Sequence, residues 1–161
     1  MGRGAAPGER IRGVRRALGW VALTIAMVSG CGSDDKAPAT CSAGARTVLG
    51  ALQRAPGHVA LEDGTLISTC VQRSLGTGEM QTLGFTYVAA ANSELKLMRR
   101  TDDAALRLGF LVGAVRRGAN KTNGVQLELV RRLEQVAGVD GPAGTGRAAY
   151  RRGIAAGEDH G

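Results

Sequence analysis

Apolar side chains recur at steps of three and four positions after residue 41, a spacing typical of amphipathic helices. A first helix is predicted over residues 42–54, with Ser42 as its N-cap and Pro56-Gly57 as its end. The clearest pattern lies at about 79–99, where one apolar stripe consists of Gly84, Val88, Ala91, Leu95 and Met98. These patterns predict a helical protein.

The next segment is apolar on nearly every side, which is typical of a central helix packed by neighbours all round. It is predicted over 102–117, with Thr101 as its N-cap. Asp102 and Asp103 lie in its first turn, where acidic side chains favour the helix dipole, and Gly118 is expected to end it.

Two glycines inside this central helix, Gly109 and Gly113, should each cost about 1 kcal/mol relative to alanine. Their i, i+4 spacing places them on one face, where the missing side chains let another helix approach closely. We expect a contact within the domain at this face, and homodimerisation is the alternative.

A further strong helix is predicted over 124–137, with Asn123 as its N-cap and Gly138 as its end. Its expected buried face consists of Val125, Leu129, Leu133 and Val136.

Three segments have weaker patterns. Residues 58–68 fit an ordered loop better than a hairpin turning at Asp63-Gly64, and Cys70 follows on a short helical turn. The Gly- and Ala-rich residues 141–161 form either a short docked helix over about 145–156 or a frayed tail.

The N-terminus has the order of features of an export signal. Residues 1–16 contain five arginines against the single acid Glu9, and the apolar run 17–28 is too short to span a membrane, which takes roughly 20 residues. Residues 1–30 are therefore predicted to be a signal peptide. Arg15-Arg16 leaves a twin-arginine route open beside the general one. No later segment is comparably apolar, so an integral membrane protein is not expected.

The run Val28-Ser29-Gly30-Cys31 resembles the lipobox of bacterial lipoproteins. The resemblance implies that Cys31 is acylated, becomes the first residue of the mature chain and binds the membrane through its lipid. The alternative is a chance cysteine after an ordinary cleavable signal. Residues 31–40 read as a flexible tether. The implied location is the outer face of the cytoplasmic membrane, or the outer membrane if the source has one.

Two cysteines remain once Cys31 carries lipid, and Cys41 and Cys70 can then pair only with each other. Disulfides persist outside the cytoplasm, so a structural bridge is predicted. A redox-active pair is the alternative, although the Cys-x-x-Cys spacing is absent. A metal site is not expected, because His58 and His160 have no second ligand at helical spacing.

The charge and the aromatic content of the chain bear on which ligands it could bind. The full chain has a net charge of +7, but residues 1–30 hold much of it, and 3% aromatic residues provide little stacking surface for bases. Nucleic-acid binding is therefore not expected. The sequence contains four arginine pairs, which are Arg99-Arg100, Arg116-Arg117, Arg131-Arg132 and Arg151-Arg152. They could form an anion-binding face. Alternatively, they lie in the last turns of helices, where positive charge is favourable, and on faces exposed to solvent.

Catalytic signatures are missing from the sequence, which has neither a Gly-x-Ser-x-Gly elbow nor a phosphate loop. No catalytic, cofactor-binding or metal-binding residue is therefore predicted, and the protein is not expected to be an enzyme. The runs at 108–119 (LGFLVGAVRRGA) and 127–134 (LELVRRLE) resemble small lipoproteins of actinobacterial type over about 41–139. That resemblance implies a secreted, lipid-anchored helical domain and transfers no active site.

Together these patterns predict an all-α fold, a small bundle of four to five helices with one disulfide over residues 41–140. The expected function is a non-enzymatic binding or scaffolding role in the cell envelope, as a monomer, with an envelope protein or polymer as partner. The alternative is an accessory or small-ligand-binding subunit of an exported enzyme or transporter complex.

Overall fold

The computed structural model describes residues 36–122, 124–138, 142–144 and 146–161. Within these ranges the fold is all-α, without strands, and one isolated bridge joins Ala60 and Leu66. A 3-10 helix, η1, is followed by six α-helices: η1 (Ala39–Ser42), α1 (Ala45–Leu52), α2 (Ile67–Arg73), α3 (Thr77–Met98), α4 (Asp102–Ala119), α5 (Val125–Ala137) and α6 (Gly146–His160). The all-α class is confirmed. The predicted number of four to five helices is wrong, because the short turn at Cys70 and the C-terminal segment are both complete helices.

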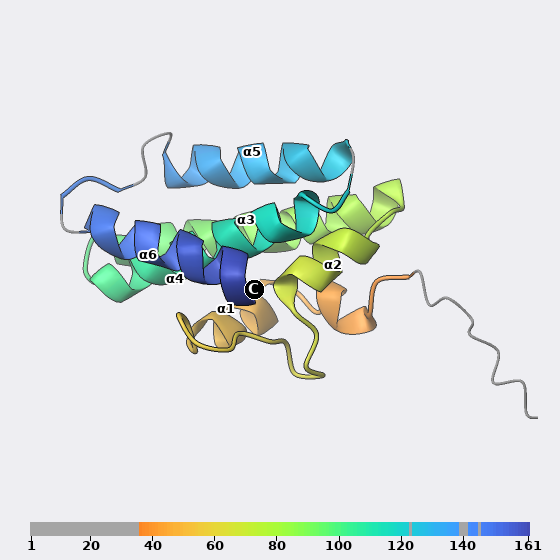
Figure 1. The fold of residues 1–161 in the computed structure, drawn as a ribbon, viewed down its shortest axis with the longest axis horizontal. Helices are drawn as coiled ribbons and strands as arrows, with labels where there is room; N and C mark the ends of the chain where they lie inside the picture. The colour runs from red at the N-terminus through yellow and green to blue at the C-terminus, as the bar shows by residue number, and fades with distance from the viewer. Residues whose placement is uncertain (1–35, 123, 139–141, 145) are drawn as a thin grey trace, which may run out of the picture. The chain divides into compact units, whose positions relative to one another are not determined.

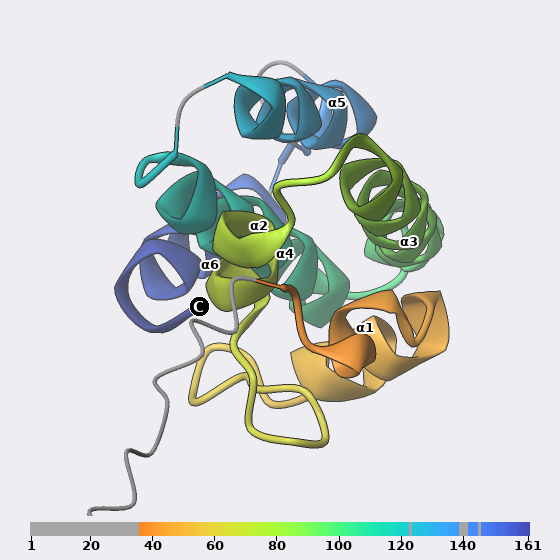
Figure 2. The same ribbon diagram turned by 90° about the vertical axis from the view of Figure 1, so that its right-hand side faces the viewer.

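The central helix of the described domain is α4, which contacts α1, α2, α3, α5 and α6 (Figure 1). Figure 2 looks along the helices, with α6 and α3 on opposite sides of α4 and α5 above it. Twelve of the eighteen residues of α4 are buried. Phe110, Leu111 and Val112 are consecutive and all fully buried, so apolar contact surrounds the helix. Burying each such side chain stabilises the fold by about 1.5 to 3 kcal/mol.

The start of α4 agrees with the prediction from the sequence, whereas its end does not. Thr101 caps its start as predicted, and its Oγ1 accepts a hydrogen bond from the Ala104 N–H at 3.4 Å. The predicted stop at Gly118 is wrong, because the helix continues through Ala119. A Cβ on Gly118 would lie 2.6 Å from the Ser68 carbonyl oxygen. This glycine therefore permits close packing against α2 and does not end the helix.

The buried face of α3 is rotated relative to the predicted stripe. It consists of Met80, Leu83, Thr86, Tyr87, Ala90, Ala91 and Glu94. Of the predicted stripe only Ala91 is fully buried, and Gly84 and Val88 lie half-buried at its edge. The helix has apolar residues on two faces, and the face that packs in the core also contains Thr86 and Glu94, which weaken its apolar pattern. At its start, the Gly76 N–H donates to Glu79 Oε2 at 3.4 Å.

The first helix is shorter than predicted. Ser42 lies in η1, where its hydroxyl donates to the Ala39 carbonyl at 2.9 Å, and α1 begins only at Ala45. The following loop is ordered, as expected, and combines the Ala60–Leu66 bridge with a tight turn. In this turn Asp63 accepts hydrogen bonds from the Thr40 hydroxyl at 2.6 Å and the Thr65 N–H at 2.9 Å, which lower the pKa of its carboxyl.

The C-terminal segment is helical from Gly146 to His160 and packs along α4. At its end, the Gly161 carbonyl accepts a hydrogen bond from the buried Ser68 hydroxyl of α2. Among the described helices, none combines the length and the apolar character needed to cross a membrane.

Candidate functional site

The predicted site residues fall in different parts of the structure. Cys31 and the lipobox, like Asn123, lie outside the described residues. Cys41 and Cys70 form the disulfide that the sequence predicts, with their Cα atoms 5.4 Å apart. Both half-cystines are buried, and the bridge ties η1 to α2. It is therefore part of the core, and it lies outside the α3–α5 groove described below.

Gly109 and Gly113 lie on the face of α4 that packs against α6. A Cβ on Gly109 would overlap the Tyr150 carbonyl oxygen, and one on Gly113 would overlap that of Ile154. The contact is reciprocal, because Gly153 of α6 faces the Leu106 carbonyl in the same way. Gly157 repeats this contact against Phe110. The two helices thus meet backbone to backbone.

The packing role of the C-terminal glycines was not predicted from the sequence. Their signal was present, because Gly153, Gly157 and Gly161 have the same four-residue spacing as the pair in α4. Matching two such faces would have indicated which helix packs on α4.

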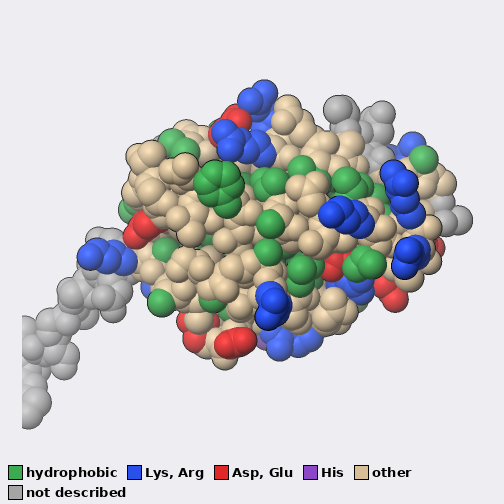
Figure 3. Space-filling view, turned by 180° about the vertical axis from the view of Figure 1, so that it is seen from behind, with side chains coloured by type: hydrophobic (Ala, Val, Ile, Leu, Met, Phe, Trp, Pro, Cys, Tyr) green, Lys and Arg blue, Asp and Glu red, His purple; other side chains and the backbone are tan. Residues whose placement is uncertain are grey.

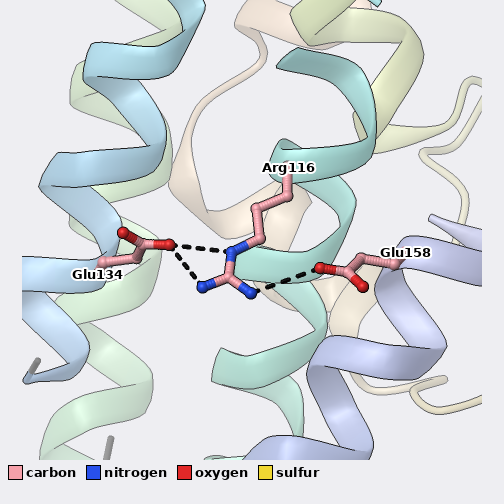
Figure 4. Close-up of polar contacts among 3 residues, drawn as sticks. All are labelled: Arg116, Glu134 and Glu158. Atoms are coloured by element: carbon pink, nitrogen blue, oxygen red, sulfur yellow. Dashed lines mark hydrogen bonds and ion pairs between the residues drawn. The ribbon is translucent and has the colours of Figure 1, made fainter. Parts of the chain in front are cut away.

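The arginine pairs do not share one role. Arg116 binds Glu134 of α5 at 2.6 Å and Glu158 of α6 at 3.4 Å, so one guanidinium links three helices (Figure 4). Partial burial acts to lower the pKa of Arg116, but the two carboxylates outweigh it and raise the pKa above its ordinary value. Arg117 donates to the Glu158 and Asp159 carbonyls at the end of α6. This pair therefore joins α4 to its neighbours.

A buried ion pair between α3 and α4 was also not predicted from the sequence. Glu94 is fully buried in α3 and accepts a hydrogen bond from Arg107 Nε of α4 at 3.0 Å. Its second oxygen, Oε2, has no hydrogen-bond partner within the described residues. The position continues the buried spacing of Tyr87 and Ala91, so a glutamate in a core register was the available signal.

An open, mainly apolar groove of about 670 Å³ lies between α3 and α5, and we call it the α3–α5 groove. Its first wall consists of residues of α3: Thr77, Met80, Gln81, Gly84, Phe85 and Val88. Its second wall consists of residues of α5: Val125, Glu128, Leu129, Arg132, Gln135 and Val136.

The two walls run side by side in the same direction, and a hydrogen bond from Gln126 to the Ser74 carbonyl joins the starts of their helices (Figure 1). Met80 and Leu129 are buried at the base, whereas Phe85 and Val125 are 69% and 63% exposed. The exposure of Val125 contradicts its predicted place on a buried face, because no helix of the described residues covers that side of α5. Figure 3 shows the side of the domain on which α3 lies, where hydrophobic side chains gather in a row with Lys and Arg around them.

The rim of the groove is charged on the α5 side. Glu128 accepts hydrogen bonds from Arg131 Nε at 2.9 Å and from Arg132 Nε at 3.1 Å, and these two arginines lower the pKa of its carboxyl. Two guanidinium groups share one carboxylate, so this part of the rim has an excess of one positive charge. The arrangement suits a ligand that is mainly apolar and carries negative charge at one point.

Groups of three or more His, Cys, Asp or Glu side chains that could hold a metal ion do not occur within the described residues. His58 and His160 are both exposed. Comparisons of the chain with protein-family models, curated proteins and solved structures find no significant match.

Proposed function

We propose that this protein is a lipid-anchored, non-enzymatic component of the cell envelope and that it acts by binding at the α3–α5 groove. The observation that carries the proposal is the uncovered apolar wall of the groove, with Phe85 and Val125 largely exposed to solvent. Contiguous apolar surface of this kind on a soluble domain marks sites of interaction.

The sequence of the N-terminus supports the anchoring. Val28-Ser29-Gly30-Cys31 follows a short apolar run, and the first described helix, η1, begins at Ala39, within the predicted tether of residues 31–40. The sequence predicts a short tether before the domain, and about ten residues of flexible chain would span roughly 17 Å, so a lipid on Cys31 would hold the domain close to the membrane surface. Two or more acyl chains would make this attachment stable.

In-cell photocrosslinking tests binding at the groove. A benzoylphenylalanine placed at Gln81, on the exposed rim of α3, should capture a neighbour in intact cells. The matched control carries the same group at Arg151, an exposed position of α6 outside the groove. Equal products from both positions, or none from Gln81, would contradict the proposed site.

The anchor is tested separately by the intact mass of the mature protein. An acyl increment on Cys31 is expected, and Cys31→Ser should release the protein or leave its precursor uncleaved. A mature chain without that increment would refute the anchoring but leave the groove intact.

The size of the groove favours the second candidate, an accessory or small-ligand-binding subunit of an exported enzyme or transporter complex. A volume of about 670 Å³ lies within the range of small-molecule sites. Extraction of the purified protein with organic solvent and mass spectrometry would identify a retained ligand. Recovery of a stoichiometric small molecule would favour this candidate over scaffolding.

A further inference from the structure

We infer that the α3–α5 groove binds the hydrocarbon chain of a long-chain fatty acid, with the carboxylate held at Arg132. The inference rests on the proposed binding function and names its ligand class. Three features of the groove support it: its elongated apolar walls, the charge of its rim and the open space at Gly84.

The groove is long and follows both helices. Its walls extend from Thr77 to Val88 and from Val125 to Val136, each about 17 Å at the rise of an α-helix. Met80 and Leu129 are buried in the groove, whereas Phe85 and Val125 are exposed along its walls. An extended hydrocarbon chain can therefore lie along the groove in contact with both walls.

The charge of the rim selects among single-chain molecules. Arg132 binds Glu128 through Nε, so within the described part of the chain its two terminal guanidinium nitrogens can still donate to a ligand. A carboxylate accepts two such hydrogen bonds in a bidentate geometry, which makes it a better match than an uncharged hydroxyl. Arg131 adds a second positive charge beside the same position.

Gly84 keeps the α3 wall open. A Cβ at this position would meet nothing within 4 Å, in contrast to Gly109 and Gly113, where the neighbouring helix excludes a side chain. The half-buried Val88 lies one turn further along the same wall. A larger side chain at Gly84 would consequently occupy ligand space without displacing the core.

Calorimetric titration of the full mature protein with dodecanoate tests the inference, with dodecanol as the uncharged probe. Saturable one-to-one binding of dodecanoate is expected. Gly84→Leu should weaken it about tenfold or more, since the leucine displaces roughly two methylene groups of the chain. Arg132→Gln should remove the preference for dodecanoate over dodecanol and leave dodecanol binding unchanged.

Gly50→Leu is the matched control, because Gly50 is an exposed glycine of α1 with open space around it. It should bind dodecanoate like the wild type. Gln81→Trp, on the exposed rim, gives a second way to fill the groove if Gly84→Leu does not fold.

Wild-type protein that does not bind dodecanoate, or groove-filling variants that bind it like the wild type, would overturn the inference. Crosslinking from Gln81 separates this failure from that of the proposed function. Crosslinks without fatty-acid binding would leave a binding groove with a different occupant, such as a protein. Failure of both experiments would reject the groove as a site.

Discussion

The same substitution, glycine to alanine, should have opposite effects on stability at two helical positions. At Gly113 a new Cβ overlaps the Ile154 carbonyl oxygen, and at Gly84 it meets nothing within 4 Å. Both positions lie inside helices, where alanine is favoured over glycine by about 1 kcal/mol. The expected changes in stability therefore differ only in the steric cost of the new Cβ.

At Gly113 the obstacle is backbone, which cannot move aside as a flexible side chain can. The two helices must separate, and the reciprocal contact of Gly157 with α4 is lost with the same movement. Overpacking of this kind costs about 1 to 3 kcal/mol. Gly113→Ala should therefore be destabilising, whereas Gly84→Ala should gain up to about 1 kcal/mol.

Thermal and urea unfolding of the purified protein, with its disulfide intact, measures both effects. For a helical domain of this size 1 kcal/mol corresponds to roughly 3 to 6 °C in Tm. A Gly113→Ala protein as stable as the wild type would refute the close packing of α4 on α6. Sedimentation of the same samples distinguishes a contact within the domain from a dimer contact, because only loss of a dimer would change the sedimentation coefficient.

Three other perturbations test the rest of the core. Cys70→Ser removes the bridge to Cys41 and should cost roughly 3.5 kcal/mol, and rapid alkylation of the native protein without reductant would contradict the pairing. Glu94→Leu leaves Arg107 without its carboxylate and should cost about 3 kcal/mol in urea unfolding, most of which should be recovered when Arg107→Leu is added; equal stability of the two variants would contradict a coupled pair. Burial raises the pKa of Tyr87, so its stabilising contribution is complete below about pH 10 and is lost as the pH rises further. Tyr87→Phe should be at most about 1 kcal/mol less stable at pH 7 and should become the more stable protein near pH 11; parallel pH profiles would contradict this assignment.

The sequence was informative where one physical cause acts locally. The Thr101 cap and the all-round apolar character of α4 are features of a single segment, and both are present in the structure. The disulfide was predicted by elimination, because Cys41 and Cys70 are the two cysteines left when Cys31 is assigned to a lipid, and the bridge is present in the structure. Each of these inferences needed no knowledge of which helices become neighbours.

The errors arose where the answer depends on neighbours. Gly118 resembles a helix stop, yet it lies inside α4 because Ser68 and Val71 of α2 pack against it. Glu94 resembles a surface residue, yet Arg107 of the next helix lets it lie in the core. In both cases a contact with another helix determined the outcome. The pattern of one segment contains no information about such a contact.

The α3–α5 groove illustrates the same limit in the opposite direction. Gly84, Val88, Val125 and Val136 all fit the apolar pattern of a buried helix face, but Gly84 and Val88 are only half-buried and Val125 is 63% exposed. The periodicity of a sequence shows that one face of a helix is apolar. It does not show whether that face is covered by another helix of the same chain or by a ligand. Positions where the predicted burial fails are therefore informative about function, since apolar surface left uncovered in the folded domain has been retained at a cost in hydration. In this protein four such positions, Gly84, Val88, Val125 and Val136, line one groove, whereas Leu95 and Met98 of the predicted α3 stripe are half-buried outside it. The four that share a groove support the proposed binding site, since single exposed apolar side chains scattered over a surface need no such explanation.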